Sequence, residues 1–446
     1  MRLVNLTESP IRDRIVKTIY QEAESITSRV VRRKKSVFDW DTRLDDILTS
    51  RWLGLPIMFF LLGFAFWLTI IGANYPSQLL AKILFWGQDQ LSVIFQWFGS
   101  PQWLHDFFVL GVYRTVAWVV SVMLPPMAIF FPLFALLEDL GYLPRLAFNL
   151  DRLFKLAGAH GKQALTMCMG FGCNAAGVTA CRIIESPRER LIAILTNNFV
   201  PCNGRFPTLI ALAFIFMGGL AGVGTASLTV AGIVMTGVAI TLLTAWFLSK
   251  TLLKGVPSTF TLELPPYRLP QIGRTIIRSL LDRTIIILTR AVLVAAPAGG
   301  LVWVLANVRP GEHSILVQGA GLLQPLGQAL GLDGFILLSF ILGLPANEIV
   351  LPILLMSYLS ANSMVEPDSL LALKILLVNG QGWTWLTALC TMLFSLLHFP
   401  CGTTLFTIWR ETKSAKWTGL AIIIPFTVAS MVCFVINWTV RTLGLI

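Results

Sequence analysis

The chain contains 446 residues, of which 55% are hydrophobic and only 13% are charged. A soluble protein of this length needs a more polar surface, so the composition excludes a soluble globular protein. The formal net charge is +11, but the basic residues cluster in short loops between apolar segments, and no nucleic-acid recognition fold accompanies them. Several windows are long enough to cross roughly 30 Å of hydrocarbon. We therefore predict an all-α, polytopic helical membrane protein that does not bind nucleic acid.

Residues 1–50 are polar, and we predict a cytoplasmic helical segment there rather than a cleavable signal peptide. The stretch IRDRIVKTIYQEAESITSRVVRRKK has apolar residues at helical spacing and ends in a basic run, Arg32 to Lys35. That run precedes the first predicted span, Trp52–Ala73. Basic residues mark the cytoplasmic side of a membrane, so we expect the N-terminus in the cytoplasm.

Residues 51–283 form the first predicted membrane half. The segment that follows the first span, to about Leu110, has one Lys and no Arg and should face outward. A long apolar stretch, Leu110–Leu137, is interrupted by three prolines and ends in EDLGYLPRLAFNLDRLFKLAGAHGK. The amphipathic pattern of that piece predicts a helix along the cytoplasmic interface. Further spans begin at Leu191 and about Leu220, and a loop rich in Lys and Arg follows, which we assign to the cytoplasm.

Residues 284–446 form the second predicted membrane half and repeat this plan. The expected apolar elements are a span at Thr284–Ala306, the stretch Gly334–Leu359, a helix from Leu370 and a last span at about Gly419–Ile436. We thus expect three regions: a cytoplasmic segment and two membrane halves.

Each half carries a break in an apolar helix. Gly170 and Asn174 in GFGCN stand four residues apart, as do Gly343 and Asn347 in GLPAN. A Pro-Cys turn follows each break, PCNGR at 201–205 and PCGTT at 400–404. Irregular backbone survives in a bilayer only where it lines a polar cavity or is buried in protein. Paired interruptions in two halves therefore indicate two repeats with broken or re-entrant helices around a transporter's substrate site.

The breaks and turns carry sulfur and amide groups. The candidate ligands are Cys173, Asn174, Cys202, Asn203 and Cys401. Thiolates, amide oxygens and unwound carbonyls form a mixed site that suits a borderline transition cation. Weak coordination at several places would let a divalent ion leave again. For the cysteines, close packing of small residues between helices is the competing interpretation.

Two further groups are candidates. His398 lies three residues before Cys401, and in a helix that spacing would place imidazole and thiol on one face. The alternative for His398 is an interior histidine with satisfied hydrogen bonds. Glu348 is a carboxylate within an apolar segment, where a charge is costly and indicates function. It could be a ligand, a proton carrier or the partner of a buried arginine such as Arg205.

The chain resembles the membrane region of FeoB, the prokaryotic ferrous iron transporter family. The similar stretches run in the family's order over roughly residues 15–440: EDLGYLPRLAFNLDRL, GFGCNAAGVTACRIIESPRERL, NNFVPCNGRFP, LELPPYRLP, GLPANEIVLPI and HFPCGTTLFTIWRETKSAKW. The resemblance implies two Gate-type repeats, a prokaryotic cytoplasmic membrane, and Fe(II) as the transported ion with no permanently bound cofactor. It also implies that Cys173, Cys202 and Cys401 take part in metal passage, and that Glu411 is the acidic residue after the last motif.

The chain departs from the family at one point. FeoB chains normally begin with a GTPase domain and a helical spacer, but no phosphate-binding GxxxxGK[ST] loop occurs here, and AGVGTAS at 221–227 lacks the lysine. Residues 11–35 resemble only the end of the spacer. Two explanations stay open: a separate chain supplies the GTPase, or the GTPase has been lost and the substrate has changed.

We therefore predict the permease part of a ferrous iron transport system rather than an enzyme, since the sequence has no HExxH, nucleophile elbow or cofactor fingerprint. The expected partners are membrane lipid, a separate GTPase subunit, a small SH3-like accessory protein and further copies of the chain. The alternatives are a Gate-type transporter of another solute, such as another divalent metal or a nucleoside, and a membrane regulator that transports nothing.

Overall fold

The computed structural model describes residues 9–30, 40–50, 53–218, 223–255, 267, 271–361, 363–364 and 369–444. These residues form helices and connecting turns, with no β-strand among them. Within them, six helical segments are long and apolar enough to cross a membrane, and one bent pair of helices raises the number to seven. The predicted all-α, polytopic architecture is confirmed. The basic run at 32–35 lies outside the described residues.

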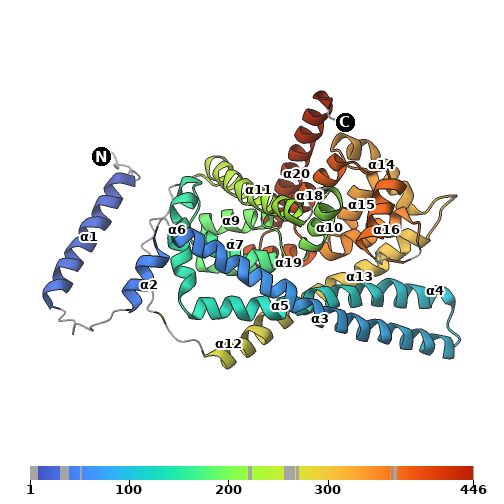
Figure 1. The fold of residues 1–446 in the computed structure, drawn as a ribbon, viewed down its shortest axis with the longest axis horizontal. Helices are drawn as coiled ribbons and strands as arrows, with labels where there is room; N and C mark the ends of the chain where they lie inside the picture. Colours follow the sequence, from blue (N-terminus) through green and yellow to red (C-terminus); the bar gives the residue numbers. More distant parts are fainter. Residues whose placement is uncertain are drawn as a thin grey trace.

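The N-terminal part ends in two long helices that lie side by side (Figure 1). Its elements are α1 (Ser9–Val30), α2 (Trp40–Leu48), α3 (Gly54–Trp97), α4 (Gln102–His105), η1 (Asp106–Tyr113) and α5 (Arg114–Asp139). With 44 residues, α3 is about 66 Å long at 1.5 Å per residue. It therefore continues far beyond the expected end at Ala73, because the following residues keep an apolar, weakly charged pattern and Pro76 does not end the helix.

The middle of the chain forms short helices around the first break. They are α6 (Tyr142–Leu156), α7 (Gln163–Gly172), α8 (Asn174–Ala180), η2 (Cys181–Ile183), α9 (Pro187–Thr196), η3 (Asn197–Phe199) and α10 (Phe206–Phe216), followed by the long α11 (Val223–Lys250). The start of α9 shows why these helices begin where they do. The Ser186 side chain accepts a hydrogen bond from the Glu189 amide, and Pro187 occupies the first turn, a favourable combination for a helix N-terminus.

The second half contains the second break. Its elements are α12 (Ile272–Ser279), η4 (Leu280–Ile285), α13 (Ile286–Asn307), α14 (Ile315–Ala329), α15 (Gly334–Leu342), η5 (Asn347–Ile349), α16 (Val350–Tyr358), α17 (Leu370–Lys374), η6 (Ile375–Gly380), α18 (Trp385–Leu397), α19 (Gly402–Thr412) and α20 (Ala415–Thr442). Helices α14 and α15 meet at an angle of 111°. The apolar stretch Gly334–Leu359 forms α15, η5 and α16, with the predicted interruption between Leu342 and Asn347.

In the view of Figure 1, the short helices α7, α9 and α19 lie between the long helices α11 and α20 above and α3 and α5 below. In the most apolar window of α18–α19, 72% of the residues are buried, compared with 22% in α20. The outer helices expose large apolar side chains such as Trp67, Leu243 and Trp438, which suits contact with lipid. The irregular backbone is thus buried inside protein, as the cost of unsatisfied amides in hydrocarbon requires.

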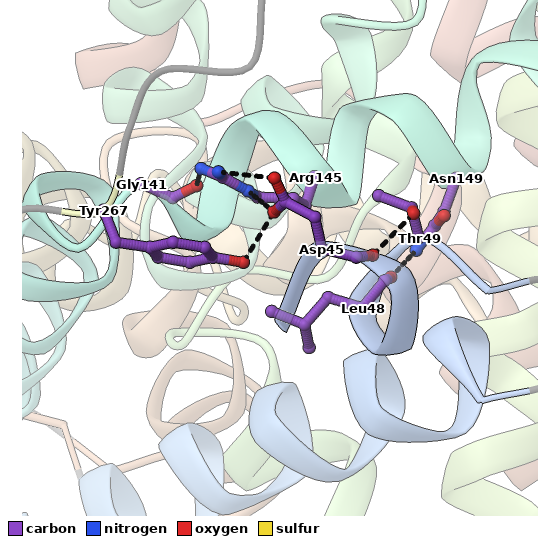
Figure 2. A network of polar contacts seen from close by, with 7 residues as sticks. All are labelled: Asp45, Leu48, Thr49, Gly141, Arg145, Asn149 and Tyr267. Carbon is purple, nitrogen blue, oxygen red and sulfur yellow. Dashed lines mark hydrogen bonds and ion pairs between the residues drawn. The ribbon is translucent and has the colours of Figure 1, made fainter. Parts of the chain in front are cut away.

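A polar junction ties the N-terminal segment to α6 (Figure 2). Arg145 on α6 is almost fully buried, and its Nε donates to Asp45 Oδ1 at 2.8 Å, while its Nη1 donates to the Gly141 carbonyl at 2.6 Å. The Tyr267 hydroxyl donates to the same Asp45 oxygen at 2.8 Å, and its ring centroid lies 3.9 Å from the guanidinium carbon. Three segments far apart in sequence are therefore held around one guanidinium group.

Candidate functional site

The two helix breaks have the same backbone geometry. Cys173 separates α7 from α8 with φ −153° and ψ 125°, and Ala346 precedes η5 with φ −152° and ψ 126°. Each of these extended residues is followed by an asparagine that begins a new helical segment, Asn174 or Asn347. The structure thus places the breaks at the positions where the spacing of GFGCN and GLPAN predicted them.

Each Pro-Cys turn packs against the break of its own half. The amide of Asn203, next to Cys202, donates to the Gly172 carbonyl at 3.3 Å, and the amide of Gly402, next to Cys401, donates to the Leu344 carbonyl at 2.5 Å. These bonds satisfy backbone groups that a broken helix leaves free. They also bring each turn cysteine next to an interrupted helix.

The breaks and turns of both halves line one small cavity of about 20 Å³. Six of the predicted site residues line it: Cys173, Asn174, Cys202, Asn203, Glu348 and Cys401. Met123 and Met127 of α5, together with Asn347 and Thr403, contribute further polar or sulfur-containing side chains. A space of this size holds about one water molecule. An ion that enters it must therefore exchange most of its hydration shell for protein ligands.

The donors surround the cavity without forming a compact metal centre. Among the described residues, no three His, Cys, Asp or Glu side chains stand close enough together to hold a metal ion. The Cys202 sulfur lies 3.7 Å from Asn347 Nδ2, and the Cys401 sulfur lies 3.3 Å from Thr404 Oγ1. The thiols of the two halves are therefore each held by a polar neighbour.

Arg205, in the first Pro-Cys turn, joins that turn to the residues just before the second one. Its side chain is almost fully buried, and its Nη1 donates to the carbonyls of Leu396 at 2.6 Å and Asn198 at 2.8 Å. Its Nη2 donates to the His398 carbonyl at 3.3 Å. The ion pairs among the described residues do not include one between Arg205 and Glu348. The guanidinium thus satisfies backbone carbonyls of both halves instead of the carboxylate that we considered.

A second cavity of about 480 Å³ lies beside α7 and α8. We call it the charged vestibule, after the six charged residues in its lining: Glu138, Arg182, Asp282, Arg290, Arg410 and Glu411. Arg182 donates to both carboxylate oxygens of Glu411, at 2.8 and 2.7 Å. This bidentate pair connects η2 in the first half to α19 in the second. Because α7 and α8 contribute to both cavities, the vestibule lies next to the small cavity.

Comparison with known proteins identifies the family to which the chain belongs. Residues 120–216 and 288–415, together more than half of the chain, match the family model named Gate and described as nucleoside recognition. The chain belongs to the Gate family. The two Gate segments contain both helix breaks and both Pro-Cys turns. Residues 230–282 match a second family model, described as the C terminus of ferrous iron transport protein B.

Curated relatives agree with this assignment. A Staphylococcus aureus protein named Fe(2+) transporter FeoB is 30% identical over 437 residues, which cover 95% of this chain and 62% of that protein. A Methanocaldococcus jannaschii protein of the same name is 27% identical, with the same coverage. A Porphyromonas gingivalis protein named as a fusion of Fe(2+) transport protein A and FeoB is 27% identical over 88% of this chain and 51% of its own length. The predicted resemblance to FeoB is confirmed, and the chain spans less than two thirds of these relatives. No solved structure matches it.

His398 is the predicted site residue that does not line the small cavity of the Gate segments. The helix ends at Leu397, and both His398 (ψ 175°) and Cys401 (ψ 159°) are extended, so the helical spacing that would place them on one face is absent. The His398 ring packs against Phe340 at a centroid distance of 4.8 Å. Its Nδ1 lies 2.9 Å from the Ser395 carbonyl. His398 therefore packs in the Gate core, and its backbone carbonyl bonds to Arg205.

Four lining residues with polar or sulfur-containing side chains were not predicted from the sequence: Met123, Met127, Asn347 and Thr403. The sequence does carry a signal for Asn347, because it is the counterpart of the candidate ligand Asn174 in the repeat. Thr403 belongs to the second Pro-Cys turn, PCGTT at 400–404. The two methionines carry no sequence signal, since an apolar helix such as α5 contains them for packing as often as for ligation. Glu411, the acidic residue implied by the resemblance, lies in the charged vestibule.

Proposed function

We propose that this chain forms the path by which ferrous iron crosses a prokaryotic cytoplasmic membrane, as the permease part of a FeoB-like system. The observation that carries the proposal is the small cavity at which Cys173, Cys202, Glu348 and Cys401 meet from both Gate segments. Thiolate, carboxylate and amide oxygen together suit a borderline divalent ion. The names of the curated relatives support iron as the cargo.

The small size of the cavity and the lack of a preformed metal centre among the described residues favour passage of an ion over its storage. A cavity of about 20 Å³ requires an ion to lose most of its water, which provides selection. Because the acidic and sulfur ligands are not gathered into a preformed centre, coordination stays weak enough for release. A tight tetrahedral site would instead retain the ion.

We propose the partners on separate grounds. A GTPase would provide energy or gating, and no GxxxxGK[ST] loop occurs within these 446 residues. The Porphyromonas gingivalis fusion with Fe(2+) transport protein A supports a small accessory protein. The transporter names of the relatives support transport rather than catalysis.

The test is uptake of radioactive ferrous iron by vesicles that contain the purified chain and any partner it requires. Cys173→Ser, Cys202→Ser and Cys401→Ser should each lower uptake by roughly tenfold or more, because a serine hydroxyl stays protonated and binds Fe(II) poorly. Cys168→Ser is the matched control, since Cys168 is buried on α7 but does not line the cavity. Undiminished uptake by all three variants would exclude the thiols as ligands.

A second candidate function is transport of a nucleoside. The charged vestibule has about 480 Å³, within the range of small-molecule sites, and the Gate model is described as nucleoside recognition. Thermal unfolding of the purified chain with Fe(II), Mn(II), Zn(II) or nucleosides separates the two functions, because a bound ligand raises the midpoint. Stabilisation by nucleosides alone would favour the second candidate.

A further inference from the structure

Asn347 lines the small cavity, and its side-chain oxygen has no hydrogen-bond partner among the described residues. Its side chain is 5% exposed and lines the cavity with Cys202, Glu348 and Cys401. Its Nδ2 lies 3.7 Å from the Cys202 sulfur, while its Oδ1 is buried with no hydrogen-bond partner in the described part of the chain. A buried carbonyl oxygen without a hydrogen-bond partner is destabilising, so a ligand that fills this position would recover that free energy.

The counterpart residue in the first half differs. Asn174 has the same place after the break, but its side-chain nitrogen, in the orientation that suits its neighbours, donates to the backbone carbonyls of Gly170 and Val200 at 3.2 Å each. Its backbone carbonyl accepts from Asn197 Nδ2 at 3.2 Å. The amide of Asn174 is thus tied into a polar cluster of its own Gate segment. Asn347 instead reaches across to the Pro-Cys turn of the other segment, with its oxygen unpaired.

The orientation of the Asn347 amide follows from the chemistry of the ion-bound state. A cysteine that binds a metal does so as a thiolate, which only accepts hydrogen bonds. The amide nitrogen must therefore face Cys202, and the amide oxygen is then free for the cation. Amide oxygens are accepted ligands for divalent ions.

We propose that Asn347 is a ligand of the transported cation: its Oδ1 coordinates the ion, while its Nδ2 holds the Cys202 sulfur in position as the second ligand. The proposal rests on the proposed function, namely that this cavity conducts a divalent cation. It adds a neutral oxygen to a set of thiolates and one carboxylate. A neutral ligand lowers the total negative charge and so speeds release of the ion compared with a second carboxylate.

The first experiment measures binding. The purified full chain, kept reduced and free of oxygen, is titrated with Co(II), whose thiolate absorption band reports sulfur ligation, and in parallel with Fe(II). Asn347→Leu keeps the side-chain size but removes both polar atoms, and it should weaken binding by about 10- to 100-fold and reduce the thiolate band. Asn307→Leu is the control, since Asn307 ends α13 and does not line the cavity.

The second experiment measures release. Asn347→Asp keeps the oxygen ligand but adds a negative charge, so it should bind Co(II) at least as tightly as the unaltered chain and yet transport Fe(II) more slowly. Size-exclusion chromatography and thermal unfolding show whether Asn347→Leu folds. If it does not fold, Asn347→Asp alone tests the ligand role of Asn347. Asn347→Asp with unchanged binding and unchanged transport would overturn the inference, as would Asn347→Leu with normal binding.

These outcomes are distinguishable from failure of the proposed function. If the unaltered chain neither binds Co(II) through sulfur nor moves Fe(II), the proposed function itself is wrong. If the unaltered chain does both and the Asn347 variants behave like it, only the ligand role of Asn347 is wrong.

Discussion

Gly204 controls where the Glu348 carboxylate lies. It belongs to the first Pro-Cys turn and lines the small cavity. A Cβ atom built on Gly204 would lie 2.1 Å from Glu348 Oε1 and 2.4 Å from its Cδ, far inside van der Waals contact. The turn of one Gate segment therefore leaves space for the acid of the other. Because Gly204 has no side chain, the Glu348 carboxylate can occupy this position, in an environment where a charge is costly.

Gly204→Ala should lower Fe(II) uptake by about tenfold with little change in unfolding temperature, because the flexible Glu348 side chain moves aside and leaves its ligand position. Uptake by vesicles and thermal unfolding in detergent are the two measurements. Gly232→Ala on α11 is the control, since its added Cβ meets nothing within 4 Å. Equal uptake by Gly204→Ala and the unaltered chain would contradict a role for the carboxylate.

At the scale of elements, the Asp45–Arg145–Tyr267 junction anchors α2 on α6 (Figure 2). Partial burial raises the pKa of Asp45, but the hydrogen bonds from Arg145 and Tyr267 and the guanidinium charge outweigh burial and leave it below its usual value. Burial, followed by the hydrogen bond to Asp45, raises the pKa of Tyr267 to about 12. The junction is therefore strongest where Asp45 is ionised and Tyr267 is neutral.

Tyr267→Phe should cost about 1 kcal/mol of stability near pH 8, the usual contribution of one hydrogen bond. An unfolded tyrosine ionises at a pKa of about 10, whereas folded Tyr267 does so at about 12. The contribution of Tyr267 is thus complete below pH 10 and is lost as the pH rises toward 12.

Thermal unfolding of both proteins between pH 8 and pH 11 checks this prediction, and the gap between their midpoints should narrow as the pH rises. Tyr75→Phe, at an exposed position on α3, should match the unaltered chain at pH 8. A gap that stays constant with pH would show that the Tyr267 hydroxyl does not stabilise the junction.

At the scale of the whole molecule, the Arg182–Glu411 pair connects the two halves at the charged vestibule. Arg182 is 64% exposed, so the pair contributes roughly 0–1 kcal/mol to stability. It holds η2 and α19 together near the small cavity. η2 follows α8, which lines that cavity through Asn174, and α19 lines it through Thr403. The pair therefore matters for the relative position of the halves more than for folding.

Arg182→Glu and Glu411→Arg should each reduce Fe(II) uptake, because either change places like charges opposite each other at the vestibule. The double variant restores opposite charges and should recover much of the uptake, while all three unfold close to the unaltered chain. Vesicle uptake combined with a double-mutant cycle measures the coupling. Additive effects in the double variant would show that the two side chains act independently.

The helix breaks, the Pro-Cys turns and the all-α membrane architecture could be predicted from the sequence, because they follow from local rules. Gly and Pro interrupt helices, apolar runs cross hydrocarbon, and the spacing within GFGCN and GLPAN repeats. The same rules placed Cys173, Cys202 and Cys401 at interruptions. The cavity they share was a reasonable expectation, since irregular backbone must be buried around polar space.

Other features depend on contacts between residues far apart in the chain. Arg205 bonds to carbonyls almost two hundred residues away, Asn347 reaches the Cys202 sulfur, and His398 turns into a cluster of aromatic rings. No local pattern distinguishes these outcomes, because each depends on how one Gate segment packs against the other. Sequence spacing specifies where the backbone breaks, whereas packing of the two halves specifies which side chains line the small cavity.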